Sequence, residues 1–219
     1  MPPSTQLQPP HTRAGQRTGR VFVVSSPSGG GKTTVVSALL KRSDRLSRSV
    51  SYTTRPRRPM ERDGADYRFV PSETFERMRR SGGFLEWAKV HEACYGTPAE
   101  PITRALASGR DVVLSIDVQG ARQIKRRFGR QAVLIFLAPP SIQDLRARLI
   151  KRHTETSESI RRRLDAAQRE LACAAWYDYV VVNRRISEAV RQLEAIVTAE
   201  RLRVNASGKE AKHEASADR

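Results

Sequence analysis

A glycine-rich segment directly after a short apolar run constrains this chain more than any other feature. The apolar run is Val21 to Ser25, and the segment that follows reads Ser26-Pro27-Ser28-Gly29-Gly30-Gly31-Lys32-Thr33-Thr34. A buried strand, a glycine-rich turn and a helix in this order are typical of a phosphate-binding loop. The glycine N–H groups and the helix N-terminus would bind phosphate, Lys32 would bridge the β- and γ-phosphates, and Thr33 would reach Mg²⁺. We therefore predict that residues 26–34 bind the phosphates of a nucleotide.

One position departs from the usual pattern of this loop. The pattern G-x-x-x-x-G-K-[ST] has glycine where this chain has Ser26. A serine is tolerated there if φ is negative, and it costs about 1 kcal/mol or more if the backbone must be left-handed. We expect the loop to form with this serine in place.

Short apolar runs alternate with segments of helical pattern along most of the chain. We predict buried strands over 21–25, 111–116, 132–137 and 179–182, each followed by a helix. Continuous apolar strands separated by long crossovers indicate a parallel sheet covered on both faces, which is an α/β three-layer fold. Residues 51–101 interrupt this rhythm with proline, glycine, charge and aromatic side chains. We predict that they form an inserted subdomain within a folded unit of 20–204, whose core is 20–50 and 102–204.

Charge and composition limit the classes of function. The chain has 40 basic and 23 acidic residues, for a net charge of +17, which favours an anionic ligand. The basic residues are dispersed, so we expect no specific nucleic-acid partner, although nonspecific binding with steep salt dependence stays open. Residues 1–19 are basic and rich in proline, and residues 205–219 show no apolar periodicity. We expect both tails to be disordered.

The sequence also indicates where the protein resides. Nothing in it approaches the roughly 18 consecutive apolar residues of a membrane span, and the N-terminus has no hydrophobic signal core. Cys94 and Cys173 are far apart, with no metal-ligand spacing around them, so neither a disulfide framework nor a zinc site is supported. We expect a cytoplasmic protein without a membrane partner.

A series of motifs resembles the guanylate kinase family. The motifs are SVSYTTRPRR at 49–58, DGADYRF at 63–69, FLEW at 84–87, YGT at 95–97, IDVQGA at 116–121, the arginine-rich stretch 148–163 and YDYVVVN at 177–183. They cover most of the chain in the family's order and spacing. The resemblance implies a P-loop kinase core, a GMP-binding insert at 51–101 and a helical lid at about 148–163. It also implies an enzyme that uses Mg²⁺ and transfers the γ-phosphate of ATP to GMP, giving ADP and GDP.

The resemblance assigns roles on the acceptor side. The residues that match the family's GMP-binding positions are Ser51, Arg55, Arg58, Tyr67, Glu86, Tyr95, Thr97 and Asp117. Arg55 and Arg58 would grip the phosphate, since guanidinium groups suit bidentate phosphate contact, and the two tyrosines would donate to the same phosphate. Glu86 would accept from guanine N1–H and its amine. Adenine lacks both donors and would leave this carboxylate unpaired. The cost would be on the order of several kcal/mol, because two hydrogen bonds to a charged group are lost.

The resemblance also assigns the transfer machinery. The residues that match catalytic positions are Lys32, Arg148, Arg152 and Arg163. Asn183 matches a residue that lies beside the donor adenine in this family. Asp117 matches an acidic residue that lies by the guanine and near the Mg²⁺ region, which Thr33 would also reach. Ser115 stands where the family commonly has a second acid. If that acid orders a water on the metal, Ser115 would weaken Mg²⁺ binding.

Two other functions and one assembly question stay open at this point. A non-catalytic guanylate-kinase-like binding module would lose the phosphate loop or the lid arginines, and this chain keeps both. A kinase that acts on a phosphorylated sugar would keep the loop but would have no use for Glu86, Ser51 and Thr97. The chain could form a homo-oligomer, a state for which the sequence gives no signal.

Overall fold

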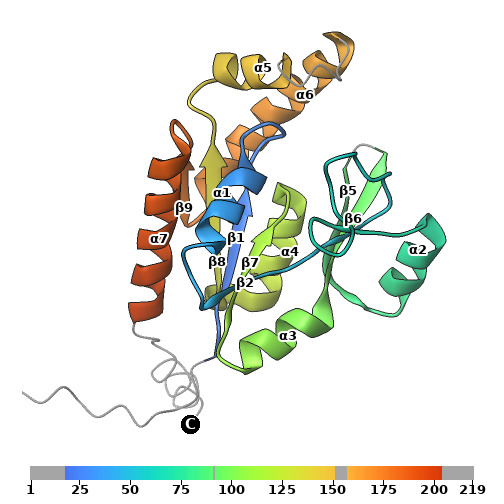
Figure 1. The fold of residues 1–219 in the computed structure, drawn as a ribbon, viewed down its shortest axis with the longest axis vertical. Helices are drawn as coiled ribbons and strands as arrows, with labels where there is room; N and C mark the ends of the chain where they lie inside the picture. The colour runs from blue at the N-terminus through green and yellow to red at the C-terminus, as the bar shows by residue number, and fades with distance from the viewer. Residues whose placement is uncertain (1–17, 91, 151–156, 204–219) are drawn as a thin grey trace, which may run out of the picture.

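A five-stranded parallel sheet forms the centre of the molecule (Figure 1). The computed structural model describes residues 18–90, 92–150 and 157–203, so most of the expected tails and Arg152 lie outside the described residues. The strand order is β2-β7-β1-β8-β9, and every neighbouring pair is parallel. The strands are β1 (Val21–Ser25), β2 (Leu46–Arg48), β7 (Asp111–Ser115), β8 (Ala132–Ala138) and β9 (Tyr179–Val182).

Helices cover both faces of this sheet, which confirms the predicted three-layer α/β fold. On one face, α1 (Lys32–Leu40) and α7 (Ile186–Leu202) pack against one set of strand side chains. On the other face, α3 (Ala99–Ala107) and α4 (Val118–Phe128) pack against the alternate set. All five residues of β1 are buried because this strand lies at the centre of the sheet. The phosphate loop that follows β1 therefore starts from a rigid strand.

Two details of the sheet differ from the prediction. β9 is an edge strand, and Val180 and Val182 remain 52% and 39% exposed, although we predicted that this run is buried. Apolar side chains alone do not reveal whether both faces of a strand are covered. The other edge strand, β2, was not predicted, because only Leu46 of its three residues is buried and it has no apolar run.

A second, smaller sheet lies within residues 51–101, between β2 and α3. Its order is β4-β3-β6-β5, formed by β3 (Tyr52–Thr53), β4 (Arg68–Phe69), β5 (Phe84–Val90) and β6 (Ala93–Pro98). The helix α2 (Ser72–Arg80) packs on it through Phe75, whose ring centroid lies 4.7 Å from that of Phe84. In Figure 1 this unit stands to the right of the central sheet, beyond α4.

Two further helices lie above the carboxyl end of the central sheet (Figure 1). They are α5 (Ile142–Ile150) and α6 (Ser157–Ala172), which pack through Leu145, Leu149 and Ala167. The turn expected between them, 151–156, lies outside the described residues. Two short 3₁₀ helices, Gly129–Gln131 and Cys173–Trp176, precede β8 and β9. No described helix is long and apolar enough to cross a membrane.

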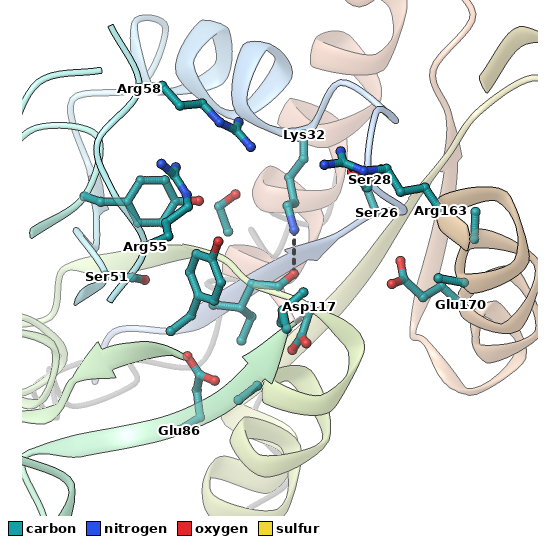
Figure 2. Close-up of a pocket in the computed structure, with 18 residues that line it drawn as sticks. Ser26, Ser28, Lys32, Ser51, Arg55, Arg58, Glu86, Asp117, Arg163 and Glu170 are labelled. Carbon is teal, nitrogen blue, oxygen red and sulfur yellow. Dashed lines mark hydrogen bonds between the residues drawn. The ribbon is translucent and has the colours of Figure 1, made fainter. Parts of the chain in front are cut away.

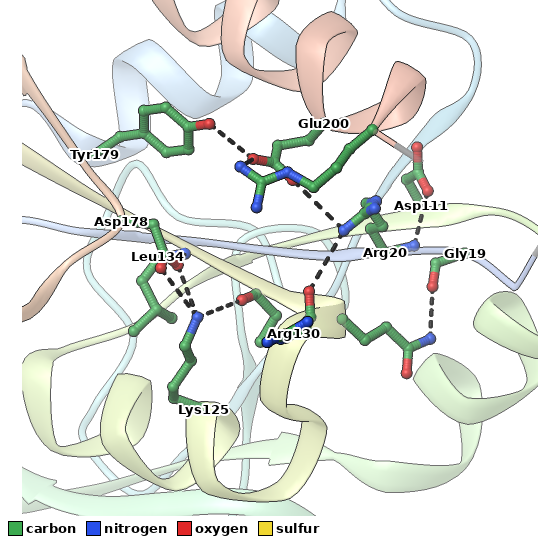
Figure 3. Close-up of polar contacts among 12 residues, drawn as sticks. Gly19, Arg20, Asp111, Lys125, Arg130, Leu134, Asp178, Tyr179 and Glu200 are labelled. Carbon is green, nitrogen blue, oxygen red and sulfur yellow. Dashed lines mark hydrogen bonds and ion pairs between the residues drawn. The ribbon is translucent and has the colours of Figure 1, made fainter. Parts of the chain in front are cut away.

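The opposite, amino end of the sheet is held by buried ion pairs (Figure 3). Arg20 lies 3.4 Å from Glu200, which also accepts a hydrogen bond of 2.7 Å from the Tyr179 hydroxyl. Asp111 accepts from the backbone N–H of Arg20 at 2.8 Å and from Arg201 at 2.6 Å. These contacts fasten the end of α7 to the starts of β1 and β7, far from the carboxyl ends where the phosphate loop lies.

Candidate active site

A single pocket gathers most of the residues singled out in the sequence (Figure 2). It opens between the carboxyl end of the central sheet, the small sheet and α6. Eleven predicted site residues line it: Ser26, Ser28, Lys32, Ser51, Arg55, Arg58, Tyr67, Glu86, Tyr95, Asp117 and Arg163. Binding at the carboxyl edge of a parallel sheet is the rule for open α/β folds.

The glycine-rich loop turns sharply between β1 and α1. Gly29 and Gly31 have φ of 89° and 91°, a left-handed conformation that side chains rarely adopt. The N–H of Gly30 donates to Pro27 O at 2.9 Å and closes the turn. Thr33 and Thr34 lie exposed in the first turn of α1. The helix N-terminus and the loop backbone therefore face the same space, as an anion-binding loop requires.

Ser26 is buried beside Gly30. Its hydroxyl donates to Pro27 O at 3.2 Å, and a Cβ on Gly30 would collide with that hydroxyl. The side chain of Ser26 is accommodated because Gly30 has none. The departure from the loop pattern is therefore compatible with the observed turn.

Three predicted side chains, those of Asn183, Arg148 and Arg163, form hydrogen bonds in or next to the loop. The Asn183 amide donates to Gly30 O at 2.8 Å, and a Cβ on Gly31 would lie 2.5 Å from the same amide nitrogen. Arg148 donates to Asn183 O at 3.0 Å. Arg163, from α6, donates to the Ser28 hydroxyl at 3.2 Å. The structure thus connects Asn183 and Arg148 to the loop itself, and contacts with adenine or with the transferred phosphate stay predictions.

Lys32 reaches across the pocket towards the end of β7. Its ammonium donates to Ile116 O at 2.9 Å (Figure 2). Burial lowers the pKa of Lys32, and the carboxylates of Asp117, Glu170 and Glu86 partly offset that effect. An ammonium that burial destabilises, and that donates to a neutral carbonyl among the described residues, is suited to donate to anionic phosphate oxygens.

Asp117 is the N-cap of α4 and lies just past the end of β7. One carboxylate oxygen accepts from the N–H of Gly120 at 2.8 Å, while the other accepts from the Gln119 amide at 3.3 Å. Ser115, two residues earlier, lines the same pocket. At the end of β7 the pocket is therefore lined by one carboxylate, that of Asp117, and by the hydroxyl of Ser115. A second acid in place of Ser115 would have added another negative charge.

The predicted base-reading residues come together on the small sheet. Glu86 on β5 lies opposite Thr97 on β6, and the Thr97 hydroxyl donates to Glu86 Oε1. The Ser51 hydroxyl is 3.5 Å from that of Thr97. Glu86 is only 3% exposed, and burial raises its pKa to about 7. A buried carboxylate aimed into a pocket is suited to a ligand that presents two N–H donors.

The predicted phosphate-gripping residues form a second group on the same subdomain. The Arg55 guanidinium lies 5.1 Å from the centre of the Tyr67 ring, which packs edge-on against Tyr95 at 5.9 Å. Arg58 is exposed at the pocket's rim. Cationic and phenolic donors therefore converge on one space, as a phosphate site requires.

Two acidic residues at this site were missed in the sequence. Glu61 forms a two-pronged ion pair with Arg55 at 2.5 and 2.7 Å and accepts from the Arg58 N–H at 3.0 Å. These contacts lower the pKa of Glu61, with the Arg55 hydrogen bond as the largest cause. Nothing in the local pattern at 55–61 signals such a pair, since the partners are six positions apart in a loop.

Glu170 is the second missed residue. It lines the pocket together with Arg163, Ala166 and Ala167. Burial raises its pKa to about 7, while Lys32 acts in the opposite direction. The spacing i, i+3, i+4, i+7 places these four residues on one face of α6. That spacing is a signal that could have identified Glu170 once Arg163 was singled out.

Comparisons with known proteins agree on one family. A family profile described as "Guanylate kinase" matches residues 18–200. The chain is 47% identical over 188 residues to a protein named "Guanylate kinase" from Chelativorans sp., and 45% identical over 190 residues to one from Syntrophotalea carbinolica. These matches cover 86% and 87% of this chain, and 86% and 90% of the relatives. The crystal structure of guanylate kinase from Anaplasma phagocytophilum matches with a TM-score of 0.74 at 33% identity, over 86% of this chain and 89% of that one.

Proposed function

The chain belongs to the guanylate kinase family, and on that premise we propose how its residues share the transfer of the γ-phosphate of ATP to GMP. Residues 26–34 would bind the phosphates of ATP, residues 51–101 would bind GMP, and residues at about 148–163 would form the lid. The observation that carries this division is the shared pocket. Its one wall presents Lys32, and its other wall presents Glu86 and Arg55.

On the acceptor side, Glu86 would accept from guanine N1–H and the exocyclic amine. Thr97 already donates to one of its oxygens, which orients the carboxylate. Ser51, whose hydroxyl is 3.5 Å from that of Thr97, would contact the same base. Arg55, Arg58, Tyr67 and Tyr95 would bind the GMP phosphate. AMP offers no donor to Glu86, so it would leave a buried carboxylate unpaired.

On the donor side, the loop N–H groups would bind the β-phosphate, and Lys32 would leave Ile116 O to bridge the β- and γ-phosphates. Arg148, Arg152 and Arg163 would neutralise the charge that develops during transfer. A phosphate oxygen of GMP attacks the γ-phosphorus as the bond to the bridging oxygen of ADP breaks. No strong general base is needed, since the attacking oxygen carries negative charge.

The donor set fits a magnesium ion that arrives with ATP. Thr33 and Asp117 offer a hydroxyl and a carboxylate near the loop, and among the described residues no cluster of three metal-ligating side chains exists. Magnesium commonly takes one or two protein oxygens together with phosphates and water. When bound, it supplies charge neutralisation to the β- and γ-phosphates. Asn183 would lie beside the adenine while its amide holds Gly30 O.

The alternative of a non-catalytic binding module has no support in the comparisons, since the relatives above carry the name "Guanylate kinase". Within the described residues, the loop, Lys32, Arg148 and Arg163 are all in place. A sugar-phosphate kinase would have no need for the buried Glu86.

The deciding experiment is a coupled ADP-release assay with ATP and Mg²⁺, in which GMP, AMP, UMP and ribose bisphosphate are compared as acceptors. We expect turnover with GMP alone, and a steep fall in kcat/KM for GMP in Glu86→Ala through a raised KM. Turnover that is unchanged in Glu86→Ala would contradict the proposed base reader. Binding of GMP without any turnover would contradict the proposed catalytic roles.

A further inference from the structure

Gly120 lies against the carboxylate of Glu86. It is the third residue of α4 and is buried, and its N–H donates to Asp117. A Cβ built on Gly120 would lie 2.9 Å from Glu86 Cδ and closer still to Oε2, with Ile116 Cδ1 at 3.2 Å on its other side. No real side chain fits there while Glu86 keeps its position.

The backbone gives no reason for a glycine at this position. Gly120 is absent from the glycines with positive φ, and its place in the first turn of α4 is one that any residue can adopt. Glycine inside a helix is less stable than alanine by roughly 0.5–1 kcal/mol. Glycine at position 120 is therefore explained by the space that it leaves for the Glu86 carboxylate, which an alanine methyl group would fill.

The strand that carries Glu86 cannot simply move away from the helix. The next residue, Trp87, is tied to α4 at both backbone groups by Gln123, whose amide accepts from Trp87 N at 3.3 Å and donates to Trp87 O at 2.7 Å. Gln123 is one turn after Gly120 and lies on the same face of the helix. A methyl group at position 120 would thus displace the Glu86 carboxylate rather than the whole strand.

We propose that Gly120 is a specificity-determining residue, because its missing side chain sets where the Glu86 carboxylate meets guanine. The inference rests on the proposed function, in which Glu86 reads the base. The Thr97 hydroxyl holds one oxygen of the carboxylate, and the empty space at Gly120 receives the other. A residue of α4, which packs on the central sheet, thereby fixes the position of the Glu86 carboxylate on the small sheet.

The test is a double-mutant cycle of Gly120→Ala and Glu86→Ala, with KM for GMP, KM for ATP and thermal unfolding measured in each variant. In the native background, Gly120→Ala should raise KM for GMP about 10- to 100-fold, the range for a misplaced charged hydrogen bond pair. KM for ATP should stay within about twofold, and the preference for GMP over AMP should fall. In the Glu86→Ala background, the added methyl group should leave KM for GMP unchanged and should not lower stability, since the Glu86 carboxylate that obstructs it is gone.

The outcomes separate this inference from the proposed function. If Glu86→Ala leaves KM for GMP unchanged, the base-reader role fails first. If Glu86→Ala raises KM for GMP but Gly120→Ala does not, the role proposed for Gly120 is refuted and that of Glu86 stands. If Gly120→Ala still raises KM for GMP in the Glu86→Ala background, the inference is also overturned. Should Gly120→Ala fail to fold, recovery of folding in the double variant supports it, and continued unfolding refutes it.

Discussion

The two sides of the pocket are built in different ways. The donor side is mainly backbone, a loop whose start is a fully buried strand and whose carbonyl at Gly30 is held by Asn183. The acceptor side is mainly side chains on a thin sheet, where Arg55 is held by Glu61 and Glu86 by Thr97. We therefore expect changes on the donor side to alter kcat or KM for ATP, and changes on the acceptor side to alter affinity for GMP.

Lys32 gives the largest expected effect on the donor side. Lys32→Met should lower kcat by about 10³-fold, because one electrostatic donor to the transferred charge is lost. The Kd for GMP should change little, as measured by calorimetry beside the coupled assay. Lys41→Met, at the exposed end of the same helix, is the matched control. If kcat falls by less than tenfold, the proposed difference between the donor and acceptor sides is contradicted.

Arg55 tests the acceptor side in the same manner. Arg55→Lys should raise KM for GMP about 10- to 100-fold, because lysine keeps the charge but not the two-pronged contact with Glu61 and with phosphate. KM for ATP should be unaffected. The neighbouring Arg57→Lys serves as control, since Arg57 donates only to the backbone oxygen of Glu61 among the described residues. Equal effects of the two substitutions would argue against the assigned role.

Asn183 probes how the donor loop is held. Asn183→Ala should raise KM for ATP about 2- to 12-fold, because Gly30 O loses its donor at 2.8 Å and keeps only the 3.5 Å bond from Arg148, a net loss of about 0.5–1.5 kcal/mol. Inhibition by inorganic tripolyphosphate, which has no adenine, distinguishes two roles. If the loop contact matters, affinity for tripolyphosphate falls as well; if only adenine contact matters, it stays constant. Arg184→Ala, at the exposed next residue, controls for local disturbance.

The acidity of Glu86 makes the acceptor side sensitive to pH. Burial raises its pKa to about 7. In the proposed role, guanine binds the ionised form. Affinity for GMP should therefore fall as pH drops below 7, by at most about tenfold per pH unit. Glu86→Gln should remove this dependence and leave that of the GMP phosphate, whose second pKa is about 6. A profile of KM for GMP that is flat from pH 8 to 6 would contradict the assignment.

The same raised pKa has a consequence for stability. The unfolded carboxyl has a pKa near 4.5, so the folded state binds the proton more tightly. The contribution of Glu86 to folding stability should decline as pH rises from 4.5 through about 7. Thermal unfolding of the native chain and of Glu86→Gln across this range measures the difference.

Ser26 gives the smallest expected effect. Ser26→Gly should change KM for ATP by less than about threefold, because Gly30 already accommodates the hydroxyl. Stability should fall by roughly 0.4–1 kcal/mol through the freer unfolded chain. A gain of tenfold in affinity for ATP would show instead that the serine strains the donor loop.

The fold could largely be predicted because its strongest signals are local. The apolar runs of β1, β7 and β8 and the glycine loop are continuous in sequence, and each forms the expected element. The edges were harder to predict. β2 has too few buried residues to show a pattern, and the exposure of Val180 depends on which strands lie beside β9. Burial at an edge is a property of neighbours rather than of the strand's own residues.

The amino-acid sequence by itself determined the parallel-sheet class, the glycine-rich loop and the residue types proposed to bind guanine and phosphate. Only the tertiary structure decided which of them share one pocket, that Glu61 pairs with Arg55, that Glu170 lines the same pocket as Lys32, and that Gly120 borders Glu86. Backbone propensity and hydrophobic periodicity act between residues close in sequence. Charge pairing, desolvation and steric fit act across space, and these features depend on contacts that only the packed chain creates.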